Sequence, residues 1–306
     1  MTVTKREVKF LARGLIVAGI LNMPEIAEEQ KNPAIVCAHP GSSCKEQTAG
    51  IYAEKLAELG FVTLVFDASY QGESEGEPRY IEDPAARVED IRCGVDYLTT
   101  LDFVDENRIG VLGVCAGGGY AVNAAMTEHR IKAVGTVAGA NIGRIYRQNG
   151  DPVQTLEAVG AQRTTEARGG EPMIVGWIPN NQEEREKAGV TDIDIVEAVD
   201  YYTTPRGQCS NSPNKLNFTS MGLVLGFDAF HLADVLLTQP LQVIVGDKLG
   251  AFGSYGDGHE LYEKAASRKK DLLVLEGVSH YDLYDQPEPV RRAVEKLGAF
   301  YKENLQ

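Results

Sequence analysis

Basic residues are scarce in this 306-residue chain. Lysine and arginine together number 30, against 44 aspartates and glutamates, which gives a formal net charge of −14. A surface of this sign repels the phosphates of nucleic acids and the anionic headgroups of lipids. We therefore expect neither nucleic acid nor a membrane among the partners of the chain.

Long apolar runs are also missing. No stretch approaches the roughly 20 apolar residues that are needed to cross a bilayer. The first ten residues, MTVTKREVKF, lack the apolar core of a signal peptide. We expect a cytoplasmic protein. Its 43% hydrophobic and 24% charged residues are ordinary values for a globular chain with a packed core.

Cysteine is infrequent, and its five positions include no C-x-x-C pair. Structural zinc sites and redox dithiols usually contain such a pair, so we expect reduced thiols, no metal and no organic cofactor. Cys37 and Cys93 carry no further signal, and unpaired cysteines are usually buried. They are expected to act as small buried hydrophobic residues.

Short apolar runs alternate with helix-forming segments along most of the chain. Two β-rich runs within residues 7–25 flank the residues ARG, which predicts an antiparallel hairpin. The later strands are apolar on both faces, which is typical of a mostly parallel sheet covered by helices on both sides. Strands are predicted at 33–39, 61–68, 108–114, 131–139, 240–247 and 271–277, and helices at 45–60, 84–101, 118–129, 258–268 and 287–304.

The alternation breaks down between residues 140 and 238. This segment holds Trp177, which is the one tryptophan of the chain, and two polar, loop-rich stretches. A loop of such length is improbable in a compact domain, so we expect a partly helical insertion. We interpret residues 1–139 and 239–306 as an α/β core and residues 140–238 as a cap over its active edge. Alternatively, residues 140–238 form a peripheral insertion that does not contact the active site.

The sequence GVCAGGG follows a predicted strand and precedes a predicted helix. Gly113, Cys115 and Gly117 match the G-x-nucleophile-x-G pattern of a nucleophile elbow, in which a strained turn exposes the reactive side chain. At the start of a helix, the macrodipole and free N–H groups favour a thiolate. The spacing does not match the G-x-G-x-x-G of a dinucleotide-binding loop. A purely structural turn around a buried cysteine stays open as an alternative.

A cysteine nucleophile needs a histidine base and an acid that orients the base, and this class of fold has the chain order nucleophile, acid, histidine. His280 follows the last predicted strand and precedes the closing helix, where the base is expected. Asp247 ends the preceding strand and is the predicted acid. Asp228 and Glu260 are alternatives for that role.

An oxyanion hole needs backbone N–H donors near the nucleophile. We predict one donor at Ala116 and the other at Gly41 or Ser42, in the loop after the strand 33–39. Pro40 has no N–H to donate. His39 in the same loop is interpreted as a residue that braces the loop rather than as a second catalytic histidine.

With these elements in place, the sequence resembles the α/β-hydrolase superfamily, and within it the dienelactone-hydrolase-like branch with a cysteine nucleophile. The resemblance rests on HPGSSCKEQTAGIYAEKLAELGF, FDASYQGESEGEPR, RIGVLGVCAGGGYAVNAAM and GVSHYDLYD. It extends over nearly the whole chain and includes bacterial hydrolases and fungal polyketide-transferase-like proteins. It implies an α/β-hydrolase fold with Cys115 as nucleophile, His280 as base and Asp247 as acid.

The sequence departs from true dienelactone hydrolases at two positions. The family's glutamate and arginine, which hold the resting thiol and the substrate carboxylate, fall on Ala38 and Gln71 here. Glu46 or Arg79 could act from nearby. Dienelactone itself is therefore not the expected substrate.

These features predict a hydrolase that cleaves an ester, thioester or lactone through an acyl-cysteine intermediate. An acyltransferase that uses the same intermediate and a non-catalytic ligand-binding protein are the alternatives. A small acyl compound is the expected partner; a homodimer is compatible with the sequence, which does not determine the oligomeric state. The substrate contacts considered are His39, Tyr70, Gln71, Arg79 and Trp177.

Overall fold

The N-terminal hairpin forms one edge of the central sheet. In the computed structural model, which describes residues 2–25 and 31–306, β1 (Val3–Ala12) pairs with β2 (Leu15–Pro24) in antiparallel register through ten residue pairs. The turn between them uses positive φ angles at Arg13 and Gly14. The predicted hairpin is confirmed. Of the predicted core, residue 1 and residues 26–30 lie outside the described residues.

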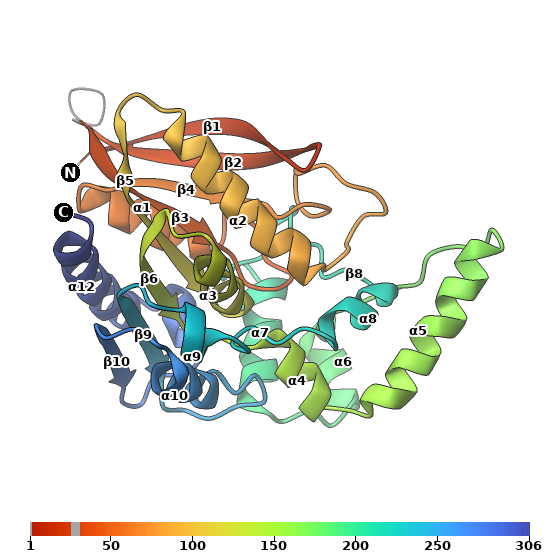
Figure 1. Ribbon diagram of the computed structural model, residues 1–306. Helices are drawn as coiled ribbons and strands as arrows, with labels where there is room; N and C mark the ends of the chain where they lie inside the picture. Colours follow the sequence, from red (N-terminus) through yellow and green to blue (C-terminus); the bar gives the residue numbers. More distant parts are fainter. Residues whose placement is uncertain (1, 26–30) are drawn as a thin grey trace.

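Six parallel strands extend this hairpin into an eight-stranded sheet (Figure 1). The strand order is β1-β2-β4-β3-β5-β6-β9-β10, and β2 pairs antiparallel with β4. Every residue of β4 and β9 is buried, because helices cover both faces of the sheet. The parallel strands are β3 (Asn32–Ala38), β4 (Val62–Phe66), β5 (Val104–Val114), β6 (Ile131–Val137), β9 (Leu241–Gly246) and β10 (Lys270–Leu275).

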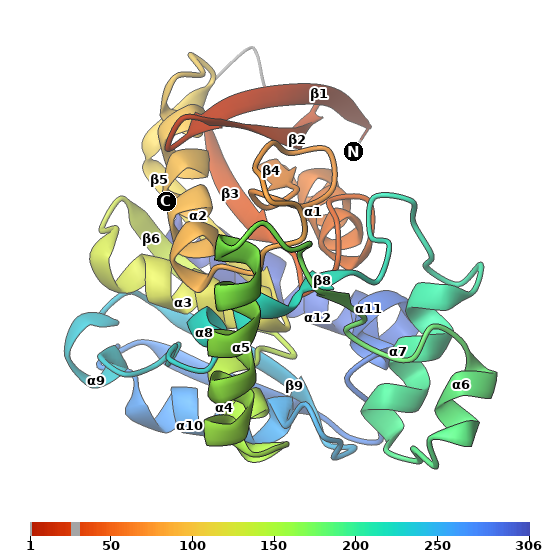
Figure 2. The ribbon, with the colours of Figure 1, turned by 90° about the vertical axis from the view of Figure 1, so that its right-hand side faces the viewer.

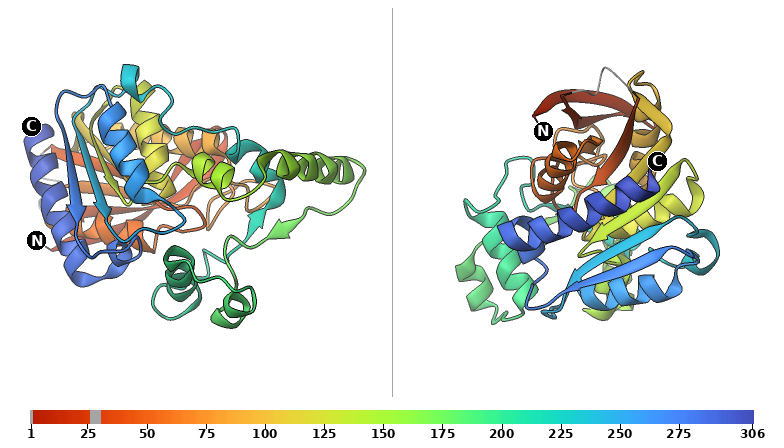
Figure 3. Two further views of the ribbon diagram at one scale, coloured as in Figure 1. Left: turned by 90° about the horizontal axis from the view of Figure 1, so that it is seen from below. Right: turned by 90° about the vertical axis from the view of Figure 1, so that its left-hand side faces the viewer.

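The covering helices lie where the sequence predicted them, and Figure 3 shows the sheet between two helical layers. One layer holds α1 (Thr48–Glu58) and α12 (Pro287–Asn304), which contact each other. The other holds α2 (Pro84–Thr99), α3 (Ala116–Thr127) and α10 (Ser254–Lys264). Both chain ends lie on the same side of the molecule (Figure 3). The predicted α/β-hydrolase fold is confirmed.

Residues 138–240 connect the neighbouring strands β6 and β9. The segment is partly helical, as predicted, whereas its role as a separate cap stays a prediction. Its longest helix, α5, extends away from the sheet (Figures 1 and 2). Its elements are α4 (Ile142–Gln148), α5 (Pro152–Ala167), β7 (Ile174–Val175), α6 (Gln182–Lys187), α7 (Ile193–Thr203), β8 (Leu216–Asn217), the 3₁₀ turn η2 (Phe218–Ser220), α8 (Met221–Val224) and α9 (Ala233–Leu236).

The parallel strands bring distant loops to one edge of the sheet. The loops after β3, β5 and β10 all leave from the carboxyl ends of parallel strands of this sheet, which is the edge where open α/β sheets bind ligands. The short helix α11 (Asp282–Asp285) follows the loop after β10. Among the described residues, no helix combines the length and the apolar character that a transmembrane span requires.

Candidate active site

Cys115 occupies a strained turn between β5 and α3. Its φ of 53° and ψ of −126° lie outside the regions that residues with a side chain normally adopt. Such a conformation costs of order 1–3 kcal/mol and persists only where the surroundings enforce it. Here, the Cys115 N–H donates to the carbonyl of Val137 at 3.1 Å, and its own carbonyl accepts from Gly118 at 2.8 Å and Ala140 at 2.9 Å.

The two glycines that flank this turn are sterically required. A Cβ at Gly113 would lie 2.1 Å from the carbonyl oxygen of Gly117, and a Cβ at Gly117 would lie 2.4 Å from the carbonyl oxygen of Ala38. Both distances are far below van der Waals contact. The G-x-C-x-G spacing therefore serves the geometry of the turn that displays the thiol.

His280 lies in the loop between β10 and α11 and is only 2% exposed. Its Nε2 faces the hydroxyl of Tyr284 at 3.2 Å, and its Nδ1 faces the hydroxyl of Ser254 at 3.0 Å. The rings of Phe252 and Tyr281 pack against the imidazole, with centroids 5.4 and 5.2 Å away. These contacts fix the orientation of the imidazole.

The thiol of Cys115 interacts with both His280 and Tyr284. Burial alone would raise its pKa. The charge of His280, together with hydrogen bonds from His280, Tyr284 and the Ala116 amide, outweighs burial and holds the pKa of Cys115 below the usual value for a thiol. A lowered pKa increases the fraction of nucleophilic thiolate near neutral pH.

Ser254 is itself held in place by the segment that follows β6. It is the first residue of α10 and is 7% exposed. One turn later, the carboxylate of Asp257 accepts from the backbone of Asn141 at 2.7 Å and from Arg144 Nη2 at 2.8 Å. Arg144 also donates to the carbonyl of Phe252 at 2.6 Å. These contacts anchor the start of α10, and with it the hydroxyl that faces His280.

The structure does not pair the predicted acid, Asp247, with His280. The Asp247 carboxylate accepts from the backbone N–H of Gly277 at 2.6 Å and so holds the loop before His280, while Nδ1 of His280 faces Ser254 instead. The alternatives also point elsewhere: Asp228 accepts from Asn141 at 2.8 Å, and Glu260 is exposed. Asp247 lies at the end of a strand, where the acid was expected, but its side chain binds the backbone of the turn at Gly277.

A cleft of about 550 Å³ opens above Cys115. It brings together five predicted residues, namely the thiol, Gly41, Ser42 and Ala116 of the proposed oxyanion hole, and Trp177. None of the described residues that line the cleft is charged, and most are aliphatic or aromatic. The remaining lining residues are Ile142, Ile145, Tyr146, Ile178, Tyr202, Phe252, Tyr281 and Tyr284.

His39 does not line this cleft and braces the loop, as the sequence interpretation favoured. It is 1% exposed, its Nδ1 faces the carbonyl of Pro40 at 2.7 Å, and its Nε2 accepts from the N–H of Ala68 at 3.1 Å. Burial, and then the nearby charge of Arg87, lower the pKa of His39 well below its usual value. A substrate contact by His39 is therefore not supported.

Three further predicted substrate contacts shape the loop after β4 instead. Gln71 donates to the carboxylate of Glu82 at 2.6 Å, and Arg79 donates to the carbonyls of Ser74 and of Gly72, the latter at 2.6 Å. The ring of Tyr70 packs where a side chain at Gly76 would otherwise lie. The polar groups of Gln71 and Arg79 are used within this segment, and none of the three residues lines the cleft.

Sequence reasoning missed Ser254 and Tyr284, the two hydroxyls that face His280. Tyr284 lies four residues after His280 in SHYDLYD, so helical spacing could have indicated it. Ser254 carries no comparable signal, because a serine at the start of a helix is common for local reasons. The aromatic wall from Phe252 and Tyr281 was also not predicted.

Comparison with known proteins now places this geometry in a family. Residues 17–157 match the model of the dienelactone hydrolase family. The chain is 43% identical over 290 residues to the uncharacterized protein YcjY of Escherichia coli (strain K12), covering 92% of each. The chain belongs to the dienelactone hydrolase family of α/β-hydrolases.

Two further kinds of relative extend the comparison. The crystal structure of the hypothetical protein PA2218 from Pseudomonas aeruginosa superposes with a TM-score of 0.89 at 33% identity, over 99% of this chain and 94% of that one. A thiohydrolase, aneE, of Aspergillus aculeatus is 32% identical over 57% of this chain and 56% of its own length. An acyltransferase, drtE, of Aspergillus calidoustus is 31% identical over 49% of this chain and 48% of its own length.

Proposed function

We propose that this protein hydrolyses acyl thioesters or esters through a covalent intermediate on Cys115. The observation that carries the proposal is the strained, cleft-facing thiol whose pKa is lowered by His280. Thiolates beside an imidazole are the usual nucleophiles of cysteine-dependent acyl chemistry. The similarity to a thiohydrolase gives independent support for a thioester substrate.

In the proposed reaction, the Cys115 thiolate attacks the acyl carbonyl and expels the thiol or alcohol, which takes its proton from the His280 imidazolium. Neutral His280 then removes a proton from water, the resulting hydroxide attacks the acyl-cysteine, and the acid leaves as the thiolate is restored. Ser254 holds the imidazole through Nδ1, and Tyr284 provides a hydroxyl beside the reacting sulfur.

The oxyanion of each tetrahedral intermediate needs donors at the edge of the cleft. The Ala116 N–H already faces the Cys115 sulfur, and Gly41 and Ser42 lie in the same cleft wall. A positive φ of 62° at Ser42 bends this loop sharply. We assign the two donors to Ala116 and to Gly41 or Ser42.

The cleft supports an uncharged, largely apolar acyl group as the substrate. A carboxylated acyl group such as dienelactone would need a cation, and none of the described lining residues provides one. Aromatic and branched aliphatic residues offer apolar contact area instead. Two sequence differences support the same conclusion. Ala38 and Gln71 stand where true dienelactone hydrolases have a glutamate and an arginine, and the Gln71 amide is already bound to Glu82.

A panel of thioesters and esters graded by acyl length tests the proposal. We expect saturable hydrolysis of apolar acyl thioesters that falls to background in Cys115→Ala and His280→Ala, whereas Cys93→Ser, a matched thiol variant on α2, stays active. Unchanged turnover by the Cys115→Ala variant would refute the assignment.

Acyl transfer is the second candidate, because aromatic walls limit the access of water to the proposed acyl-cysteine. The similarity to an acyltransferase favours it as well. Product analysis by mass spectrometry, with and without added alcohols or amines, separates the two reactions. A new ester or amide that forms at the expense of the free acid would show transfer.

A further inference from the structure

Two cysteines outside the candidate active site, the buried Cys44 and the partly exposed Cys209, lie close together, although they are far apart in the sequence. Cys44 follows β3 in the loop that carries Gly41 and Ser42, and Cys209 lies between α7 and β8. Their sulfur atoms and a carboxylate oxygen of Glu46 all lie within 4.8 Å of one another. Cys37 and Cys93 are buried as predicted, and burial raises the pKa of both thiols, as it does that of Cys44.

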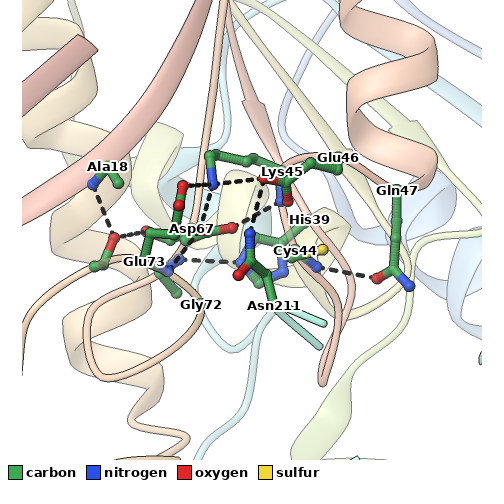
Figure 4. Close-up of polar contacts among 12 residues, drawn as sticks. Ala18, His39, Cys44, Lys45, Glu46, Gln47, Asp67, Gly72, Glu73 and Asn211 are labelled. Carbon is green, nitrogen blue, oxygen red and sulfur yellow. Dashed lines mark hydrogen bonds and ion pairs between the residues drawn. The ribbon is translucent and has the colours of Figure 1, made fainter. Parts of the chain in front are cut away.

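The ligand atoms are positioned by neighbouring contacts. Glu46 Oε1 accepts from the side-chain amide of Asn211 at 3.0 Å and pairs with the Lys45 ammonium at 2.7 Å. The Cys44 thiol also hydrogen-bonds to this carboxylate. Figure 4 shows Cys44, Lys45, Glu46 and Asn211 in this arrangement. Such second contacts fix the orientation of metal ligands in proteins.

A neighbouring group of carboxylates is already paired with an ammonium. Glu46, Asp67 and Glu73 lie close together, but the buried ammonium of Lys45 contacts all three, at 2.7, 2.8 and 2.6 Å (Figure 4). A second cation among these carboxylates would be repelled by that ammonium. The Lys45 ammonium also contacts Glu46, so the two thiols are what distinguishes the group of Cys44, Glu46 and Cys209 from these carboxylates.

We propose that Cys44, Glu46 and Cys209 form a binding site for a thiophilic divalent cation of the zinc class. Two thiolates and one carboxylate are ligands that Zn²⁺ accepts, and thiolates disfavour Mg²⁺ and Ca²⁺. Binding replaces the two thiol protons, which are released to solvent. The three ligand charges against one dication leave one negative charge at the site.

The bound cation would join the oxyanion loop to the segment after α7. Two contacts already connect these parts: Gln47 donates to the carbonyl of Gly207 at 2.6 Å, and Ser212 donates to the carbonyl of Ser42. A cation at Cys44 and Cys209 would reinforce this connection directly beside Ser42. Glu46 is exposed and Cys209 is half-buried, so solvent ions have a path of entry.

Metal titration of the reduced, full-length protein tests this site without using catalysis. Zn²⁺ is titrated in competition with a chromophoric chelator, and Cd²⁺ binding is followed through its ultraviolet thiolate charge-transfer band. We expect one ion per chain with thiolate ligation. Cys44→Ser and Cys209→Ser should each weaken binding at least about 100-fold, and Glu46→Gln should weaken it about tenfold or more.

Cys93→Ser and Cys115→Ala are the matched thiol controls and should bind Zn²⁺ as tightly as the parent protein. Absence of stoichiometric binding by the reduced parent protein would overturn the proposal. So would unchanged affinity in Cys209→Ser, or loss of binding only in Cys115→Ala, which would locate the ion at the cleft. If a variant changes the rate of hydrolysis but not the affinity for Zn²⁺, the result bears on the proposed hydrolase function and not on the metal site.

Discussion

Replacement of Ser254 by alanine tests the most unexpected feature of the candidate active site. The Ser254 hydroxyl lies 3.0 Å from Nδ1 of His280 and is the partner that the structure provides where a carboxylate was predicted. In Ser254→Ala, this nitrogen loses its partner inside a site that is only 2% exposed at His280. The imidazole would then be less well oriented and its protonated form less well stabilised.

The magnitude follows from the loss of one neutral hydrogen bond in a buried place. A buried polar group left without a partner costs about 1–3 kcal/mol. If this cost falls on the transition state, kcat/KM decreases about 5- to 150-fold. Loss of a triad carboxylate is far more damaging and costs about 10⁴-fold in kcat in serine proteases. The two roles therefore differ by orders of magnitude.

The assay is thioester hydrolysis over a range of pH, with two comparison variants. Asp247→Asn keeps an oxygen that can accept from Gly277 and should stay within about threefold of the parent rate. Ser267→Ala removes another buried serine, whose hydroxyl contacts Lys269, and should also leave the rate unchanged. Ser254→Thr, which keeps the hydroxyl, should recover much of the rate lost in Ser254→Ala and restore the parent pH profile.

A loss of about 10³-fold or more in Asp247→Asn, together with an unaffected Ser254→Ala, would refute this reasoning. It would mean that the aspartate turns to His280 during the reaction. A Ser254→Ala variant with a lower rate but an unchanged pH profile would also count against a role through the imidazole.

Three further predictions follow from the same geometry. Because His280 lowers the pKa of Cys115, alkylation by iodoacetamide should be lost only as the pH falls through this lowered pKa, and His280→Ala should move the midpoint of the alkylation profile to higher pH. Trp177→Ala removes an aromatic cleft wall worth about 2 kcal/mol of apolar contact, so kcat/KM should fall about 30-fold for long acyl substrates and little for acetyl substrates. Arg87→Ala leaves the fully buried Glu82 carboxylate without its cation and should lower the free energy of unfolding in urea by about 3–5 kcal/mol.

Much of the fold was predictable because strand and helix signals are local. Apolar runs in the sequence predicted the strands β3 to β6, β9 and β10, and helix-forming segments predicted the helices between them. The closing helix α12 was predicted at its observed range. Cys115 and His280 were predicted as a reactive pair from the fixed places that this class of fold gives to a nucleophile and a base, and the structure brings the two side chains together. The strained φ of Cys115 agrees with the elbow pattern.

The residues that orient His280 and line the cleft were harder to predict, because they depend on tertiary packing. Asp247 occupies the expected strand end, but the direction of its side chain is set by the loop at Gly277. Ser254 reaches His280 only because Arg144 and Asp257 hold α10 in place. No periodic pattern in the sequence records such contacts, of which the one between Arg144 and Asp257 spans 113 residues.

Trapping of the covalent intermediate tests the central claim most directly. The protein would be mixed with an apolar acyl thioester, quenched in acid within the first turnovers and digested for mass spectrometry. We predict that the acyl mass appears on the peptide that contains Cys115, increases in His280→Ala given a preactivated aryl ester, and is absent in Cys115→Ala. Substrate turnover with the acyl group on another residue, or with no acylated peptide in the parent protein and in His280→Ala, would contradict the account.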